Sequence, residues 1–201
     1  FSKIDGQSAE RLANVPFLVT SDTTGEAHVL VTDENGMAST SAEWNAHTHA
    51  TNANDAAIVE QDGKTTVDAE LLDAKAGIWF NGRADVECAP DDELGALPYD
   101  TYTIAELPCA ANENLELVSF TTVISRNNRE IDLGTVDDNA GPALTTSLAD
   151  GNGAKLVAAE GEAVLVDTVA YANLKPDCSY TLEGQLHAVD GEGQDLGVVA
   201  E

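Results

Sequence analysis

Two charged residues occupy positions that the alternation of side chains along a strand assigns to the core. Lys3 is in phase with Phe1, and Glu106 is in phase with Tyr102 and Ile104. Burial favours the neutral, nucleophilic form of a lysine amine and the protonated form of a glutamate. Held together in a core, such residues can do nucleophilic and acid–base chemistry. A buried salt bridge or a position at a sheet edge is the alternative interpretation.

A third segment, at residues 131–137, shows the same kind of pattern. Ile131 and Leu133 are in phase with Thr135 and Asp137. Asp137 is therefore expected on the inner face of a late strand, where a charged group needs a partner.

Other patterns associated with catalysis or metal binding are weak. The sequence has no nucleophile elbow, phosphate-binding loop, dinucleotide-binding glycine motif or zinc-protease motif. His47 and His49 can share one strand face, but one histidine pair falls short of a zinc site. Asp91, Asp92 and Glu93 offer paired carboxylates for glycoside hydrolysis, although a solvated acidic surface explains them more simply. We expect no metal, no cofactor and no enzymatic activity.

Strands are the elements expected to position these groups. Runs rich in β-branched and aromatic residues are separated by Gly, Asp and Asn, and they lie at residues 17–20, 26–32, 101–105, 120–124 and 164–169. Asn35-Gly36 is a strong turn signal. The spacing predicts an all-β, immunoglobulin-like or prealbumin-like β-sandwich.

An insertion at about residues 39–92 interrupts this strand pattern. Residues 66–75 favour a short helix, and Gly77 is placed to end it. The insertion is thus expected to be partly helical, and its length exceeds that of an ordinary hairpin loop.

Acidic residues followed by Gly141-Pro142 mark the expected domain boundary. We place domains at residues 1–138 and 139–201. The second has only about sixty residues, against about 100 for a complete sandwich, so we expect part of a second sandwich whose remaining strands lie beyond this chain.

Charge and composition restrict the classes of molecule that the chain is expected to bind. The chain has 36 acidic and nine basic residues and a net charge of −27, which repels nucleic acid and anionic lipid. No apolar run approaches the roughly 20 residues of a membrane helix, so we expect no membrane contact within this chain. Among the cysteines Cys88, Cys109 and Cys178, the first two are able to pair, and isolated thiols are the alternative.

Three segments of the first domain resemble a known family. They are residues 1–6 (FSKIDG), 12–19 (LANVPFLV) and 101–108 (TYTIAELP), and they resemble collagen-adhesin B-type (CnaB-like, prealbumin-fold) domains of Gram-positive adhesins and pilins. Such domains commonly carry an isopeptide bond from a first-strand lysine to a last-strand Asn or Asp, assisted by a glutamate. The resemblance implies Lys3 as the lysine and Glu106 as the assisting residue. Asp137 is the implied acceptor, with Asp132 and Asn128 as alternatives.

Further segments resemble surface proteins of actinobacteria that carry VaFE repeats. Residues 29–36, 77–80 and 95–102 resemble their N-terminal modules, and residues 142–146, 166–176 and 180–184 resemble the first half of a repeat. VaFE-like domains resemble those that form a Thr-Gln ester bond. Thr146 is the implied threonine, because it is in phase with Leu144 and Leu148, and Asp167 is a candidate assisting acid. The partner glutamine is expected beyond this chain.

These resemblances imply a structural stalk or adhesin module of a cell-wall-anchored surface protein of a Gram-positive bacterium, stabilised by its own cross-links. Attachment to peptidoglycan would then occur through a C-terminal part outside this chain. The alternative function is a ligand-binding adhesin tip, in which the insertion offers Trp44, Trp79 and Tyr99 to a host glycan or protein.

Overall fold

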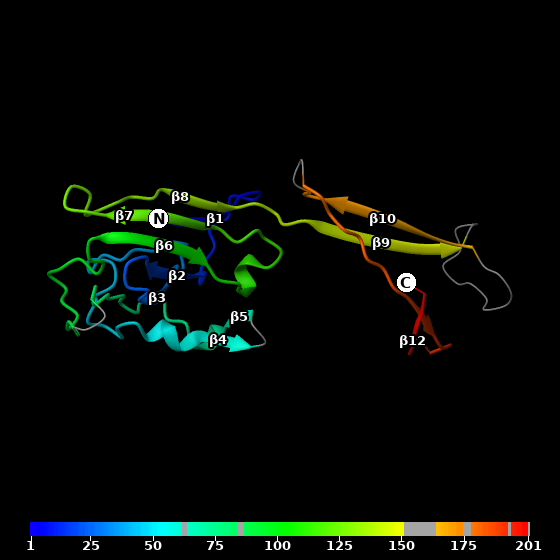
Figure 1. Ribbon diagram of the computed structural model, residues 1–201, viewed down its shortest axis with the longest axis horizontal. Helices are drawn as coiled ribbons and strands as arrows, with labels where there is room; N and C mark the ends of the chain where they lie inside the picture. Colours follow the sequence, from blue (N-terminus) through cyan, green and yellow to red (C-terminus); the bar gives the residue numbers. More distant parts are fainter. Residues whose placement is uncertain (62–63, 84–86, 151–163, 175–177, 193, 201) are drawn as a thin grey trace. The chain divides into compact units, whose positions relative to one another are not determined.

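The computed structural model describes residues 1–61, 64–83, 87–150, 164–174, 178–192 and 194–200, and nearly all of its regular elements are β-strands (Figure 1). The all-β fold class is confirmed. The chain divides into two compact units, Phe1–Gly141 and Pro142–Glu201. This division falls within the acidic, Gly-Pro segment that the sequence marks as a boundary.

A four-stranded antiparallel sheet is the centre of the first unit. Its strand order is β3-β2-β6-β7, with β2 at Pro16–Ser21, β3 at Ala27–Val31, β6 at Asp100–Glu106 and β7 at Ser119–Ile124. A second layer is formed by β1 (Ser2–Asp5) and β8 (Thr135–Asp138), which pair in parallel. The first and last strands of the unit are therefore neighbours.

The main core lies on the face of the sheet that carries Phe17, Val19, Tyr102 and Ile104. Alternation along β6 buries Tyr102, Ile104 and Glu106, as the sequence predicts. The insertion contributes to the same core through a buried segment of Ile78, Trp79 and Phe80. The insertion is thus part of the fold, and its apolar residues cannot be removed without opening the core.

The opposite face of the sheet is also covered by the insertion. A hairpin of β4 (Ile58–Gln61) and β5 (Lys64–Val67) contributes to a second cluster that contains Val29, Val31 and Leu107. Both sides of β3 are therefore covered, which explains its apolar character on both of its sides, whereas Val123 on β7 remains 53% exposed.

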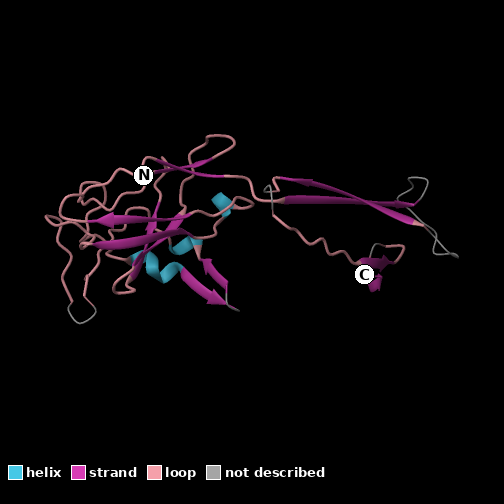
Figure 2. Cartoon of the chain, turned by 45° about the horizontal axis from the view of Figure 1, so that its top comes forward, coloured by secondary structure: helices cyan, strands magenta, loops and turns pink. Residues whose placement is uncertain are grey.

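The predicted helix at residues 66–75 is wrong. Val67 pairs with Ile58 in the hairpin, and the only helical structure in this stretch is a 3₁₀ turn, η2 (Ala69–Leu71), capped by Asp68. Asn54 then holds the backbone of Asp73 through both its amide oxygen and its amide nitrogen. Pairing and side-chain hydrogen bonds outweigh the helix propensity here. The other helical segments of the described residues, η1 (Ala53–Ala57) and η3 (Ala110–Asn112), are also short 3₁₀ turns (Figure 2).

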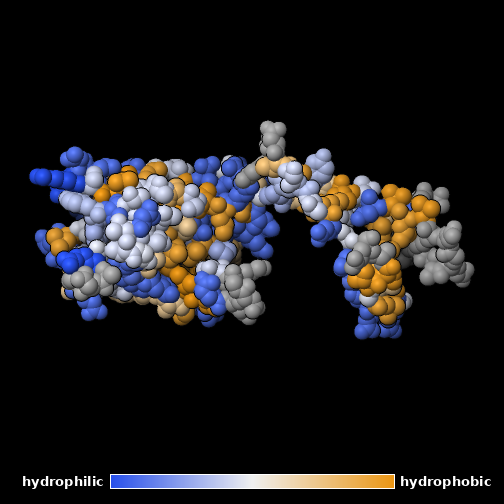
Figure 3. Space-filling view, in the orientation of Figure 1, coloured by the Kyte–Doolittle hydropathy of each residue, from blue (hydrophilic) through white to orange (hydrophobic). Residues whose placement is uncertain are grey.

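In the described residues of the second unit, the strands form two antiparallel pairs. They pair β9 (Ala143–Asp150) with β10 (Leu165–Ala172), and β11 (Leu186–Val189) with β12 (Asp195–Ala200). Large hydrophobic side chains remain exposed on β9 and β10, including Leu144 and Tyr171. Figure 3 shows such residues gathered on the surface of this unit. An exposed apolar sheet face is what half of a sandwich would present.

His28 on β3 joins the sheet to the insertion. Its Nδ1 lies 2.7 Å from Asp55 Oδ2 in η1, and its Nε2 lies 3.2 Å from Glu26 Oε1. Glu26 in turn accepts hydrogen bonds from the backbone N–H groups of Asn81 and Gly82. Burial opposes protonation, but the hydrogen bonds and charges of Asp55 and Glu26 outweigh it and raise the pKa of His28 above 6.5.

Replacing His28 by Gln should therefore destabilise the first unit in a pH-dependent way. A raised folded-state pKa gives a stabilising contribution that is fully present below pH 6.5 and is lost as the pH rises through the folded-state pKa. The expected loss of unfolding free energy is about 1 kcal/mol at acidic pH and smaller at alkaline pH. Denaturant unfolding across this range measures it, with the exposed His49→Gln as control. A loss that is independent of pH would contradict the role of the charged imidazole.

A buried lysine–carboxylate cluster as the candidate functional site

Lys3 is completely buried, with a relative exposure of 0%. Its backbone N–H donates to the Gly36 carbonyl at 2.7 Å, and its carbonyl accepts from Leu12 N–H at 3.0 Å, so β1 is fixed between two other segments. The side chain passes the Phe17 ring, with Nζ 5.9 Å from the ring centroid. Nζ then contacts Glu106 Oε2 at 3.0 Å and Asp138 Oδ1. The ammonium group therefore meets two carboxyl groups in the interior.

Glu106 is held at the end of β6 from several directions. Asn112 Nδ2 donates to Oε1 at 2.8 Å, and Val118 N–H donates to Oε2 at 3.2 Å. Together with Lys3, these donors satisfy both carboxyl oxygens. These contacts hold the carboxyl group in one orientation beside Lys3.

Asp138 is also completely buried, but it is only partly satisfied. Oδ1 contacts Lys3, whereas Oδ2 has no hydrogen-bond partner among the described residues. Burial raises the pKa of Asp138 to about 6; the hydrogen bond and charge of Glu106 add to the rise, while Lys3 opposes it. The neutral acid of Asp138 is thus more accessible at mildly acidic pH than that of an ordinary aspartate.

The prediction of Asp137 as the residue facing Lys3 is wrong. Asp137 is exposed, and the alternatives Asp132 and Asn128 are exposed as well. The phase changes at Gly134, which has a φ of +68° and whose N–H donates to Asp132 Oδ1 at 2.8 Å. This local turn interrupts the alternation that begins at Ile131, so residue 138 points inward instead of residue 137.

The other polar residues singled out in the sequence do not join this cluster. The imidazole of His47 is buried, with Nδ1 3.1 Å from Asp91 O and Nε2 3.0 Å from Thr40 O, while His49 is exposed. Within the described ranges, no group of three or more His, Cys, Asp or Glu side chains is arranged to hold a metal ion. Cys88, Cys109 and Cys178 are free thiols, so the possible pair of Cys88 and Cys109 is not formed. No helix in the described part of the chain is long and apolar enough to cross a membrane.

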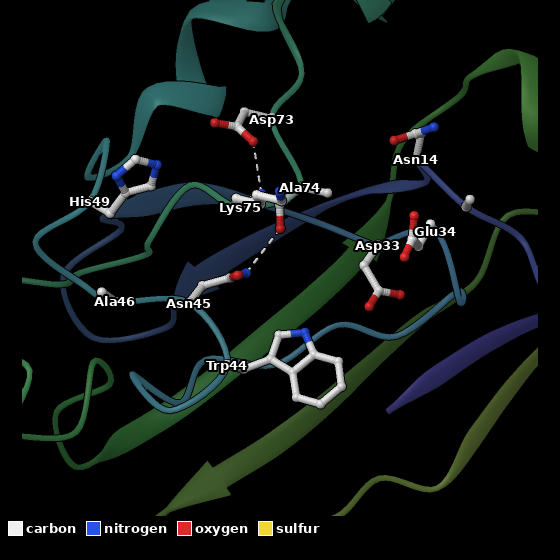
Figure 4. Close-up of a pocket in the computed structure, with 11 residues that line it drawn as sticks. Asn14, Asp33, Glu34, Trp44, Asn45, Ala46, His49, Asp73, Ala74 and Lys75 are labelled. Carbon is white, nitrogen blue, oxygen red and sulfur yellow. Dashed lines mark hydrogen bonds between the residues drawn. The ribbon is translucent and has the colours of Figure 1, made fainter.

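A groove of about 730 Å³ lies where the insertion meets the turn after β3. Trp44, which is 49% exposed, lines it together with Asp33, Glu34 and His49 (Figure 4). Asn45 Nδ2 donates to the Ala74 carbonyl at 2.9 Å, which fixes one wall of the groove. Of the three aromatic residues expected on the surface of this unit, Trp79 is instead a core residue.

In the second unit, Thr146 and Asp167 share one face of the β9–β10 hairpin. Thr146 is paired with Val169, and Asp167 with the next residue on the same face, Leu148. Thr146 and Asp167 are therefore diagonal neighbours, and both are exposed. Their roles in an ester bond stay predictions.

The comparisons with known proteins concern the second unit. Residues 142–200 match the family described as the T-Q ester bond containing domain. No curated protein and no solved structure matches this chain. The second unit is thus similar to domains named for a Thr-Gln ester bond, which agrees with the resemblance carried by residues 142–184.

Gly6 allows β1 to approach Asp138. Its N–H donates to the Asp138 carbonyl at 2.7 Å, and a Cβ at this position would lie 2.5 Å from the same oxygen. Gly6→Ala should therefore push β1 and β8 apart and lower the unfolding free energy by about 1–3 kcal/mol.

The matched control is Gly95→Ala, because a Cβ there meets no atom within 4 Å. Denaturant unfolding of both variants provides the comparison, and the control should change stability by no more than about 0.5 kcal/mol. Equal effects of the two substitutions would show that the close approach at Gly6 is unimportant.

Proposed function

We propose that the first unit is a structural module that cross-links itself, through an amide bond between Lys3 Nζ and Asp138 Cγ. The observation that carries the proposal is the joint burial of Lys3, Glu106 and Asp138, with Asp138 Oδ2 left without a partner. An unpartnered buried carboxyl oxygen is costly in a merely structural ion pair. In a reactive cluster, an oxygen without a partner is free to leave the carboxyl group as water.

The reaction balances with the groups present. Glu106 takes a proton from the Lys3 ammonium group through Oε2, and the neutral amine attacks Cγ of the protonated Asp138. The C–N bond forms, and the C–O bond to one Asp138 oxygen breaks. That oxygen leaves as water with its own proton and one more from the amine, relayed by Glu106. Glu106 ends as the neutral acid, and no net charge remains buried. Each molecule reacts once, so the proposal describes no enzyme.

Such a bond would join the first and last strands of the unit. Lys3 and Asp138 are separated by 135 positions in the sequence. In the chain-entropy model, closing a loop of roughly 100 residues stabilises a domain by about 4–5 kcal/mol. Because β1 and β8 are the strands that tension on the ends of the unit would separate, the bond would also let load pass without unfolding.

The wider role follows from both units together. We infer a module of an extracellular surface adhesin, supported by the match of residues 142–200 to a T-Q ester bond containing domain. The location on the cell wall of a Gram-positive bacterium, the attachment to peptidoglycan and the role as a stalk are proposals that rest on the resemblances. The net charge of −27 agrees with a solvated surface module.

Intact-mass measurement tests the cross-link directly. The folded protein should weigh one water less than its sequence, and Asp137→Ala should leave that loss unchanged. Lys3→Ala, Asp138→Ala and Glu106→Ala should each keep the full mass, because they remove the amine, the acceptor and the proton acceptor. Glu106→Ala should fold, but it should lose at least about 4–5 kcal/mol of stability, because both the cross-link and a partner of the buried Lys3 are removed.

A wild-type protein with its full mass would sink the proposal. If Asp137→Ala, rather than Asp138→Ala, prevented the loss of water, the acceptor would be misassigned. A larger loss of stability for Glu106→Ala than for Lys3→Ala, with no loss of water in the wild type, would point to an ordinary buried ion pair.

A second candidate function is favoured by the groove beside the insertion. Its half-exposed indole and nearby carboxylate and imidazole groups are the combination that binds polar ligands with apolar faces, such as a host glycan. An exposed surface segment of a host protein is the other ligand class of this candidate.

Trp44→Ala should weaken binding of such a ligand by about tenfold or more, because a buried aromatic contact is lost. Glycan-array binding followed by calorimetry measures the change. Tyr99→Ala is the control, since Tyr99 is 61% exposed and is not among the residues that line the groove. If the wild type bound no glycan and no host protein, the binding function would be rejected and the spacer role would remain.

A further inference from the structure

Asn112 is a buried amide directly behind the lysine–carboxylate cluster. It ends the 3₁₀ turn η3 that follows β6, and it is only 3% exposed. Its Nδ2 donates to Glu106 Oε1 at 2.8 Å and to the Leu107 carbonyl at 2.9 Å. Its Oδ1 accepts from the backbone N–H of Cys109 at 2.8 Å. The side chain thus makes hydrogen bonds on both of its polar atoms.

These backbone contacts fix which way the amide points. A backbone N–H can only donate, and a backbone carbonyl can only accept. Cys109 therefore binds the amide oxygen, and Leu107 binds the NH₂ group. Rotating the amide by half a turn would break both contacts and leave two buried backbone groups unpaired. Asn112 can consequently offer Glu106 a hydrogen-bond donor and cannot offer it an acceptor.

This restriction decides which oxygen of Glu106 meets Lys3. Oε1 is the oxygen that Asn112 holds, at 2.8 Å. Oε2 accepts from Val118 N–H at 3.2 Å and lies 3.0 Å from Lys3 Nζ. Asn112 thus anchors one carboxyl oxygen while the other faces the amine that must give up a proton.

We propose that Asn112 is the positioning residue of the cross-linking reaction, which anchors Glu106 through Oε1 and so keeps Oε2 against Lys3 Nζ. This inference rests on the proposed Lys3–Asp138 bond. Asn112 does not touch Lys3 or Asp138 through any contact described above, so it acts through Glu106.

The proposal predicts a change in the pH dependence of bond formation. The rate of bond formation should follow a bell-shaped curve against pH, because Glu106 must be ionised and Asp138 must be protonated. The acid and alkaline limbs of this curve report apparent pKa values of the cluster as a whole. Loss of the Asn112 donor removes a hydrogen bond that favours the ionised glutamate. The acid limb should then move to higher pH by about one to two units, while the alkaline limb stays in place.

The experiment measures cross-linking during refolding of the whole chain. Unlinked chains are recovered unfolded from inclusion bodies and refolded at a series of pH values. Samples are quenched with time, and the fraction that has lost one water is read by intact mass, including the fraction already linked at the start. Asn112→Ala removes the hydrogen-bond donor, and Asn112→Leu removes it while keeping nearly the same side-chain volume. If one variant fails to fold, the other is used for the measurement.

Asn54→Ala is the matched control. Asn54 is equally buried, at 2% exposure, and its amide also bridges backbone groups, but those groups belong to Asp73 in the insertion. A general loss of stability should therefore affect both sites, whereas the shift of the acid limb should appear only at Asn112.

An acid limb that stays in place in the Asn112 variants, or one that moves equally in Asn54→Ala, would overturn the inference. Either result would leave the cross-link itself intact, provided that the wild type loses one water. Failure of the wild type to lose water at any pH would instead refute the proposed function.

Discussion

The burial of one ammonium group beside two carboxyl groups is the interaction on which the first unit depends. Taking an isolated ion out of water costs several kcal/mol, so Lys3 is tolerated inside only because Glu106 and Asp138 accompany it. This requirement fixes the two ends of the unit, since Lys3 lies on β1 and Asp138 on β8. Parallel pairing of these strands then closes the sandwich. The same desolvation that makes the cluster costly as an ion pair raises the pKa of Asp138.

The insertion changes what the sandwich can present to the outside. Its segment with Ile78, Trp79 and Phe80 completes the main core, and its hairpin covers the second face of the sheet. Aromatic residues of the insertion such as Trp79 and Phe80 therefore serve the core. Trp44 is exposed instead, at the place where the insertion borders the turn after β3. The His28 network holds that arrangement by joining β3 to η1. The groove is thus built on residues that the insertion and the turn after β3 hold in place.

The two units differ in the burial of the groups singled out for covalent chemistry. In the first, the lysine amine and the two carboxyl groups meet in the interior. In the second, which matches the T-Q ester bond containing domain, Thr146 and Asp167 share a sheet face that is exposed. Attack by a threonine hydroxyl also needs exclusion of water, since water would compete as the nucleophile. An opposing sheet over β9 and β10 would supply that exclusion.

The sequence by itself determined the all-β class, the main strands and the inward positions of Lys3 and Glu106. These follow from local alternation, because β6 is an unbroken run in which every second side chain shares a face. Tertiary structure decided the rest. Asp138 replaces Asp137 because a turn at Gly134 shifts the phase by one residue, and pairing of β8 with β1 then selects the buried carboxyl group. Residues 66–75 lose their helical propensity to the β4–β5 hairpin. Asn112 carries no pattern in the sequence, since its place behind Glu106 depends on how η3 folds back over the end of β6. Strand periodicity is a local property, whereas the partner of a buried charge is set by contacts between segments far apart in the chain.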